Sequence, residues 1–315
     1  MTCSMRQNLR TSAPEGGKTH VFECALGEVR FGIWSASKPD SHGTILLLPG
    51  RTEFIEKYFE VIRDLLVRNY SVLIMDWPGQ GLSARPLSNR YKHHLASFDP
   101  VVASLGDLLR LDVTRELPRP LHLLAHSMGG HLSLRYLGDY DHEIKKAVFS
   151  SPMIDLLYPG MPRSLGRLLI KTMSVFGFSE RYAPGNMDYG SLQRSAVGMA
   201  LLTSDPERFQ DEHFLIDRNP DLALGGVTYG WLQAAQRSID LLASPGYAEG
   251  LSMPILIVQA GSDRLIDKAR VALFAHRLPN GQLEFIEEAR HEILKERDSI
   301  RDQFWTHFDK FMNAN

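Results

Sequence analysis

Short apolar runs recur along the chain, and each is followed by a sharp turn and, in most cases, by a stretch with helical spacing. The runs lie in TILLLPG (44–50), SVLIMDWPGQG (71–81), LHLLAHS (121–127), IKKAVFSSP (144–152) and MPILIVQAGSD (253–263). Continuous apolar strands that alternate with helices are typical of a mostly parallel sheet covered on both faces. We therefore predict an α/β fold whose functional loops lie at the carboxyl ends of the strands.

The two ends of the chain extend this pattern. After a polar lead-in, residues 19–36 alternate in polarity around Gly27 and predict an antiparallel hairpin. Near the other end we predict a helix from Asp267, a short strand in GQLEFIEEAR (281–290) and a last helix. The apolar stripe of that helix consists of Ile293, Ile300, Phe304, Phe308 and Phe311.

The alternation stops after Pro152. Residues 153–226 contain no clear strand, and they hold the amphipathic stretch RSLGRLLIKTMSVFGF (163–178) and polar loops rich in Asp, Gly and Pro. The prediction is therefore a core in two parts, 1–152 and 227–315, with an inserted and mainly helical cap at 153–226.

Charge and composition narrow the classes of partner. The 315 residues include 35 Lys plus Arg and 37 Asp plus Glu, without a long run of like charges, which argues against nucleic acid. The two cysteines, Cys3 and Cys24, and an N-terminus without an apolar core lead us to expect a cytoplasmic protein. No window approaches the roughly 18 to 20 apolar residues of a membrane span. Any membrane contact is therefore expected to be peripheral, at the inner face.

Ser127 is the candidate nucleophile. It lies where an apolar strand meets a helical pattern, at the centre of Ala125-His126-Ser127-Met128-Gly129. This context is that of the Gly-x-Ser-x-Gly turn, which needs small residues two positions before and after the serine. Gly129 meets that need and Ala125 adds one methyl group. The alternative interpretation is a serine in an ordinary strand-to-helix loop.

A serine hydroxyl needs a histidine base and an orienting carboxylate, in the chain order Ser, acid, His for this type of fold. Asp263 and His291 both follow apolar strands in that order. Asp155 and Asp267 compete for the role of the acid, and Asp267 is better explained as the N-cap of the helix that follows it.

Three other histidines are assigned no catalytic role. His276 and His307 fall within helical patterns, and we expect them to be structural. His126 adjoins the candidate nucleophile, and we expect the turn to point its side chain elsewhere.

The oxyanion of an acyl-transfer reaction needs two fixed N–H donors. The backbone N–H of Met128, which follows the nucleophile, is one candidate. The backbone N–H of Arg51, just after Pro49-Gly50, is the other. The alternative is that Pro49-Gly50 forms only a turn.

Together these segments resemble the α/β-hydrolase superfamily over nearly the whole chain, and more specifically the bacterial lysophospholipases and monoacylglycerol lipases. LLLPGRTEFIEKY (46–58) is similar to their oxyanion loop, MDWPGQGLS (75–83) to a conserved turn, and GSDRLID (261–267) and EARHEILKE (288–296) to their acid and histidine segments. LLTSDPERF (201–209) and GGVTYGWL (225–232) are similar to the lysophospholipase branch.

The resemblance implies the same roles as the residues do: Ser127 as nucleophile, Asp263 as acid, His291 as base, and the amides of Arg51 and Met128 as oxyanion hole. It implies neither a metal nor an organic cofactor. The chain departs from the family pattern at Pro49, Pro78, Gln80 and Ala125, which affects the shape of loops and so the substrate preference.

Residues that bind substrate are expected in the cap and at Arg51. Leu169, Met173 and Phe176 belong to a helical stripe that suits a lid over an acyl tunnel or a helix on a membrane surface. We nevertheless expect first that this stripe packs onto the core, and the lid or membrane helix is the alternative. The Arg51 side chain is expected to pair with Glu53 or Glu56; the alternative is that it meets the phosphate of a lysophospholipid.

The predicted function is the hydrolysis of lipid-like carboxylic esters, foremost lysophospholipids, through an acyl-enzyme. A monoacylglycerol lipase and a general carboxylesterase are alternatives. An aminopeptidase, an acyltransferase or a non-catalytic binding protein on the same fold are more distant ones. Epoxide hydrolases and dehalogenases are disfavoured because they use an aspartate at the position of Ser127.

Overall fold

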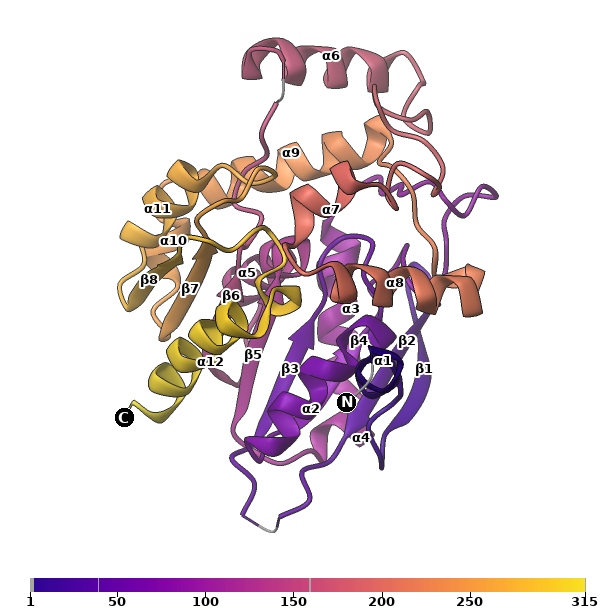
Figure 1. Cartoon of the computed structure of the whole chain (residues 1–315). Coiled ribbons are helices and arrows are strands. Elements are labelled where there is room, and N and C mark those ends of the chain that lie inside the picture. Colours follow the sequence, from indigo (N-terminus) through magenta and orange to yellow (C-terminus); the bar gives the residue numbers. More distant parts are fainter. Residues whose placement is uncertain (1–2, 39, 159, 315) are drawn as a thin grey trace.

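A single eight-stranded sheet runs through the computed structural model, which describes residues 3–38, 40–158 and 160–314 (Figure 1). The strands are β1 (Lys18–Cys24), β2 (Gly27–Trp34), β3 (Thr44–Leu48), β4 (Ser71–Met75), β5 (Leu121–His126), β6 (Ile144–Ser150), β7 (Ile255–Ala260) and β8 (Gly281–Ile286). Their order across the sheet is β1-β2-β4-β3-β5-β6-β7-β8. Strand β2 pairs antiparallel with β1, as the predicted hairpin requires, and with β4, and the remaining pairs are parallel.

Helices cover both faces of the sheet, as the continuous apolar strands predict. The helices α2 (Phe59–Val67) and α12 (Asp298–Asn313) bury Ile62, Phe304 and Phe308 on one face. The opposite face is covered by α3 (Asp99–Arg110), α5 (Ser127–Asp139), α9 (Tyr229–Ala243) and α11 (Lys268–His276). Each strand from β3 to β7 is thus buried on both sides, which stabilises a parallel sheet.

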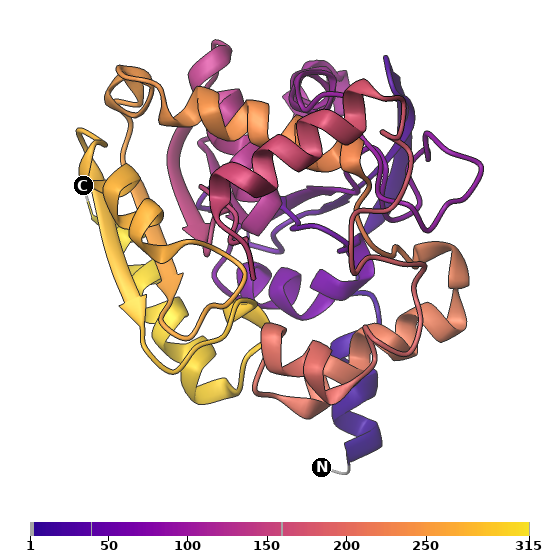
Figure 2. The ribbon, with the colours of Figure 1, turned by 90° about the horizontal axis from the view of Figure 1, so that it is seen from above.

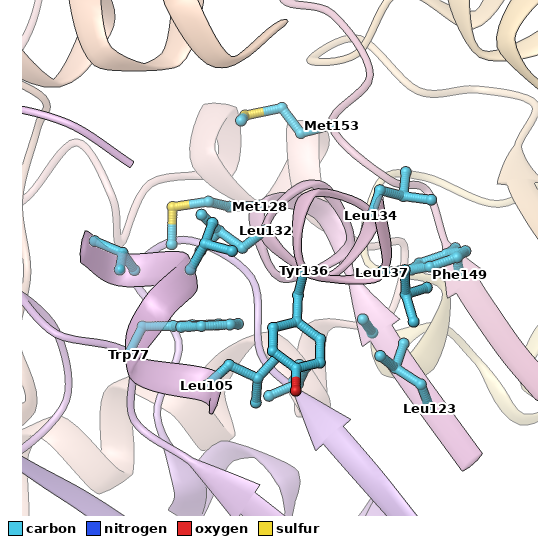
Figure 3. Packing of buried hydrophobic residues seen from close by; sticks show 14 of the residues in the cluster. Trp77, Leu105, Leu123, Met128, Leu132, Leu134, Tyr136, Leu137, Phe149 and Met153 are labelled. Carbon is cyan, nitrogen blue, oxygen red and sulfur yellow. The ribbon is translucent and has the colours of Figure 1, made fainter. Parts of the chain in front are cut away.

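Helix α5 carries the candidate nucleophile at its first residue, and its packing holds that residue in place. Figure 3 shows Met128, Leu132 and Leu137 of α5 among the side chains of the buried cluster on this face. Trp77 and Leu105 approach from one side, and Leu123 and Phe149 of the underlying strands from the other. Because this cluster surrounds the helix, the start of α5 has little freedom to move relative to β5.

Residues 153–226 hold three helices, α6 (Arg163–Val175), α7 (Ala196–Leu202) and α8 (Pro206–Arg218), and the short turn η2 (Pro220–Leu222). All three helices lie above the end of the sheet to which the parallel strands point, and α6 crosses over α9 (Figures 1 and 2). No strand longer than an isolated bridge occurs in the described residues of this segment.

Several short elements complete the chain. They are α1 (Cys3–Thr11), η1 (Ile55–Tyr58), α4 (Asp112–Arg115), α10 (Tyr247–Gly250) and η3 (Ile293–Lys295). Helix α1 was not expected from the polar lead-in, and it is anchored by polar contacts: the Arg10 guanidinium binds the Asp211 carboxylate of α8 at 2.5 Å. Ile293 lies in η3 and not in the last helix, although its side chain joins the same buried cluster as predicted.

None of the helices in the described part of the chain combines the length and the apolar character that crossing a membrane requires.

Candidate active site

The turn between β5 and α5 holds Ser127 in a left-handed backbone conformation, with φ of 49°. Such a conformation is unfavourable for a residue with a Cβ and is stabilised only by its surroundings. Gly129 allows the turn to close, because a Cβ there would lie 2.3 Å from the carbonyl oxygen of Pro49. Ala125 lies in β5 beside Leu48, and its methyl group is part of the buried core. The sheet thus accommodates the alanine that departs from the Gly-x-Ser-x-Gly pattern.

The structure brings Ser127, Asp263 and His291 together from three separate loops. The Nε2 atom of His291 lies 2.8 Å from Oγ of Ser127, and its Nδ1 lies 2.7 Å from Oδ2 of Asp263. All three residues are buried. The distances are those of hydrogen bonds between a nucleophile, a base and an orienting carboxylate.

The surroundings of Asp263 favour its ionised form. Burial opposes ionisation, but His291 and the backbone N–H groups of Leu265 and Ile266, at 2.8 and 3.2 Å, lower the pKa of the carboxyl. Burial likewise disfavours the charged form of His291, but Asp263 outweighs it and the pKa of the imidazole is raised. A neutral His291 whose Nδ1–H donates to Asp263 presents an unprotonated Nε2 to the hydroxyl of Ser127.

The competing acids occupy other positions. The carboxylate of Asp155 binds Arg163 of α6. That of Asp267 caps α11 by accepting hydrogen bonds from the N–H groups of Ala269 and Arg270, as predicted. Neither carboxylate is hydrogen-bonded to His291 in the described residues, whereas that of Asp263 is.

His276 and His307 lie away from the Ser127 cavity, but His126 does not point elsewhere as expected, since it lines the cavity beside Ser127 and His291. His276 is exposed near the end of α11, and His307 lies on α12 with Nδ1 3.9 Å from Glu284. The ring of His126 contacts that of His291, but its Nδ1 is hydrogen-bonded to the carbonyl of Ser150 at 2.9 Å.

The loop after β3 lies directly against the nucleophile. A Cβ placed on Gly50 would be 3.2 Å from Cβ of Ser127, which shows how closely the two backbones approach. The loop is fixed by side chains that bind its backbone: Gln80 donates to the Gly50 carbonyl at 2.7 Å, and Glu53 accepts from the Gly50 N–H at 2.5 Å. Its next residue is Arg51. Met128 lies in the first turn of α5, where backbone N–H groups have no acceptor within the helix.

The Arg51 side chain does not pair with Glu53 or Glu56, so the expected structural pairing was wrong. Glu53 forms an ion pair with Lys57, and Glu56 forms one with Arg30. The guanidinium of Arg51 instead donates to the carbonyl of Gly225 at 3.0 Å. Charged neighbours in the sequence point in different directions here, because the chain turns sharply at Thr52, where φ is 67°.

A cavity of about 420 Å³ opens onto Ser127 and His291. Its apolar wall comes mainly from the segment between α6 and β7, and consists of Met187, Leu192, Val197, Leu201, Leu202, Phe209, Leu224 and Leu265. Its polar wall contains Arg51, Asn186, Tyr189, Gln193, Glu212, His213 and Glu292. This volume and mixed lining are typical of a site for a small amphipathic molecule.

The residues of α6 that were expected to bind substrate do not line this cavity. Leu169 and Met173 are partly buried and Phe176 is 72% exposed, and none of them borders the space around Ser127. The helix packs on α9, and the α7 and α8 region lies closer to the serine. That prediction was wrong for the cavity, because helical spacing identifies an apolar face without identifying the surface that it meets.

A cluster of charged groups next to the cavity was also missed. Lys57 is buried and surrounded by the carboxylates of Glu53, Glu212 and Glu292. Glu53 and Glu292 lie close to the candidate site residues Arg51 and His291 in the sequence, and this proximity was the signal that could have indicated the cluster. Glu212 comes from α8, and nothing in the local sequence indicates that it reaches Lys57.

The arrangement has components of acyl transfer by a serine. It combines a hydroxyl hydrogen-bonded to a base, a carboxylate behind the base, and a helix that begins at the serine. Within residues 3–38, 40–158 and 160–314, no three His, Cys, Asp or Glu side chains are grouped so as to hold a metal ion.

Comparison with known proteins agrees with the fold. The chain is 32% identical over 270 residues to a Haemophilus influenzae protein named "Probable lysophospholipase L2", covering 86% of this chain and 83% of that one. It is 28% identical over 284 residues to lysophospholipase L2 of Escherichia coli K12, covering 87% and 80%. Among solved structures, a soluble variant of the monoglyceride lipase of Saccharomyces cerevisiae superposes with a TM-score of 0.73 at 18% identity, covering 95% and 97%.

A family model described as serine aminopeptidase S33 matches residues 39–298, which include every strand from β3 to β8 and all three residues of the Ser127 site. The chain therefore belongs to this family of α/β-hydrolases.

Proposed function

We propose that the protein is a carboxylic ester hydrolase that cleaves the acyl ester of lysophospholipids, with Ser127 as nucleophile, His291 as base and Asp263 as orienting acid. The observation that carries the proposal is the pair of hydrogen bonds, 2.8 and 2.7 Å long, that links the three side chains at the wall of an amphipathic cavity. The names of the relatives support a lipid ester as substrate.

In the proposed mechanism, Oγ of Ser127 attacks the ester carbonyl while Nε2 of His291 takes the hydroxyl proton. His291 then gives this proton to the leaving glycerol oxygen, and the acyl group stays on the serine. Water, deprotonated by His291, cleaves this acyl-enzyme and releases the fatty acid. Asp263 stabilises the imidazolium that forms in each half-reaction.

The negative charge on the carbonyl oxygen needs N–H donors near Ser127. We propose the backbone N–H groups of Met128 and Arg51 for this role. Two features support the assignment: Met128 lies at the positive end of α5, and the loop that precedes Arg51 is held against Ser127 by Gln80 and Glu53.

The polar wall of the cavity favours a phosphate-bearing head group over an uncharged glycerol. Within the described residues no carboxylate forms an ion pair with Arg51. Burial lowers the pKa of its guanidinium to about 10, although the negative charge of Glu212 acts to raise it. His213 presents a buried Nε2 for which these residues provide no hydrogen-bond partner. An anionic phosphate would supply an acceptor for both groups.

A monoacylglycerol lipase or a general esterase would use the same nucleophile without the phosphate contact. An aminopeptidase, the class in the family's description, would need a free carboxylate for the amino group of its substrate. Glu212 and Glu292 do line the cavity, but both are already bound to Lys57, at 2.5 and 2.8 Å. This arrangement favours an esterase over an aminopeptidase. Transfer of the acyl group to a second substrate instead of water would be seen as an acylated product in the same assays.

The decisive experiment is a hydrolysis panel of lysophospholipids, monoacylglycerols, short esters and aminoacyl amides. We expect lysophospholipids to give the highest kcat/KM and the Ser127→Ala variant to lose a factor on the order of 10³ or more on every active substrate. Near-normal hydrolysis by Ser127→Ala, or failure of a fluorophosphonate probe to label the protein, would refute the mechanism.

Arg51→Ala tests the head-group assignment separately. It keeps the backbone N–H, so we expect monoacylglycerol hydrolysis to change little while kcat/KM for lysophospholipids falls on the order of 10-fold or more, as for the loss of one charged hydrogen-bonded pair. Equal losses on both substrates would refute the phosphate contact.

We also propose that residues 153–226 act as a cap and that α6 contacts a lipid surface. Leu165, Leu168, Val175 and Phe176 are exposed on this helix or at its end, by 54 to 72%, and Lys171 lies exposed among them. Apolar side chains with neighbouring cations suit the interface of anionic membranes. We expect Leu168→Asp/Phe176→Asp to reduce co-sedimentation with anionic vesicles without changing the hydrolysis of a dissolved short ester. Unchanged co-sedimentation would exclude the contact.

A further inference from the structure

Lys57 joins three segments of the chain through a buried cluster of carboxylates. Its Nζ lies 2.5 Å from Oε2 of Glu212, 2.8 Å from Oε1 of Glu292 and 3.1 Å from Oε1 of Glu53. The lysine side chain is only 4% exposed. An ammonium group has three N–H donors, and each of these carboxylates lies within reach of one.

Two of the three contacts lead directly to groups that the proposed mechanism uses. The second oxygen of Glu53, Oε2, accepts hydrogen bonds from the Gly50 N–H at 2.5 Å and from the Tyr58 hydroxyl at 2.6 Å. Gly50 immediately precedes Arg51, whose N–H is the proposed oxyanion donor. Glu292 immediately follows the proposed base in the sequence. Lys57 therefore connects the oxyanion loop to the histidine loop.

The third contact leads to the wall of the cavity. Glu212 belongs to α8 and lines the space around Ser127, as does Glu292. Figure 1 shows α8 above the end of the sheet on the side of β2 and β4, whereas β8, which precedes the histidine loop, forms the opposite edge. The ion pair between Lys57 and Glu212 thus links the position of α8 to the positions of the oxyanion loop and the histidine loop.

We propose that Lys57 is a positioning residue, which keeps the Arg51 amide and the His291 ring correctly placed relative to Ser127. Through Glu212 it also couples the position of α8 to the positions of these groups. The inference rests on the acyl-transfer function proposed above. Lys57 does not line the cavity, so its effect on the reaction is transmitted through the three carboxylates.

The charge balance explains why the lysine is needed. Three carboxylates at one point, two buried and one partly buried, repel one another, and among the described residues Lys57 alone forms ion pairs with all three. Burial raises the pKa of Glu292 to about 7, against the opposing effect of Lys57 and with the help of Glu53 and Glu212. Without the ammonium group, the carboxylates would separate or take up protons. The oxyanion loop and the histidine loop would then no longer be joined through one side chain.

The test compares Lys57→Met with Lys57→Arg, which keeps the charge, and with Lys295→Met as a matched control. Lys295 is also buried, but its Nζ lies 4.0 Å from Glu60 and forms no ion pair with Glu53, Glu212 or Glu292 among the described residues. The readouts are kcat and KM for a dissolved short ester and the rate at which a fluorophosphonate labels Ser127. We expect Lys57→Met to lower kcat and the labelling rate on the order of 10²-fold, with a much smaller change in KM. Lys57→Arg should restore most of the loss, and Lys295→Met should leave both rates near those of the wild type.

Wild-type rates in Lys57→Met, or an equal loss in Lys295→Met, would overturn the proposal. If Lys57→Met does not fold, as judged by circular dichroism and thermal unfolding, Glu212→Gln decides the question. This variant removes one contact only, and we expect slower labelling at an unchanged unfolding temperature; unchanged labelling would overturn the coupling to α8. Labelling of Ser127→Ala at the wild-type rate would instead refute the proposed function itself, so the two failures can be distinguished.

Discussion

The hydrogen bond between Asp263 and His291 determines which ring nitrogen faces Ser127. Asp263 is buried, and it is held by backbone N–H groups as well as by His291. We expect Asp263→Asn to keep the fold but to favour the wrong tautomer of the imidazole, and so to lower kcat by a factor on the order of 10⁴. Steady-state kinetics measure this effect. Asp267→Asn, which changes only a helix cap, is the matched control, and a comparable loss in that variant would contradict the assignment.

The pKa of His291 also depends on a carboxylate next to it in the sequence. Burial lowers this pKa, but Asp263, Glu292 and Glu53 raise it above the ordinary value. Since the base must be neutral to accept a proton, activity falls as the pH drops through the pKa of His291. Glu292→Gln removes one of the groups that raise the pKa, so we expect the acid limb of the kcat/KM profile to move to lower pH. Glu288→Gln, at an exposed position in the same loop, should leave the limb in place. A shift to higher pH in Glu292→Gln would contradict the proposed electrostatics.

At the scale of elements, the contact between the β3 loop and the start of α5 sets the position of the nucleophile. A Cβ on Gly129 would meet the carbonyl oxygens of Leu48 and Pro49 at 2.4 and 2.3 Å, and backbone atoms cannot yield as a flexible side chain does. We expect Gly129→Ala to destabilise the protein by about 1–3 kcal/mol and to lower kcat, because the turn must open to admit the methyl group. Denaturant unfolding and steady-state kinetics measure the two effects.

Ala125→Gly is the complementary change on the other side of the turn. It restores the usual glycine at a position inside β5 that pairs with Leu48 of β3, so we expect activity to stay largely intact. A large gain or loss of kcat would show that the methyl group of Ala125 helps to position Ser127.

At the scale of the whole molecule, two buried clusters lie on opposite faces of the sheet, and only one of them contains α5. Phe304 of α12 is fully buried in the cluster on the face away from α5. We expect Phe304→Ala to lower the free energy of unfolding by about 3–5 kcal/mol while kcat per folded molecule stays near the wild-type value. Phe285→Ala, at a residue that is 41% exposed, should change stability by less than about 0.5 kcal/mol. A proportional loss of kcat in Phe304→Ala would show that the two faces are coupled.

The succession of strands and helices, and the positions of the candidate catalytic residues after them, could be predicted from the amino-acid pattern alone. Apolar runs of five or six residues specify buried strands, and residues that follow such runs must lie at one edge of a parallel sheet. For this reason Ser127, Asp263 and His291 could be predicted as a set, and the structure brings them within hydrogen-bond distance. Their catalytic role remains a prediction that the experiments above test.

The contacts between side chains of segments that are distant in the sequence could not be predicted in this way and are known from the folded structure. The stripe on α6 predicted an apolar face but not its neighbour, and the cavity is lined by residues after α6 instead. Arg51 reaches Gly225 and not the acids close to it in the chain, and Lys57 gathers carboxylates from three segments. Hydrophobic periodicity indicates which face of one helix or strand is buried. Contacts between distant segments depend on how several helices and strands pack together, and the sequence of any one of them does not specify this packing.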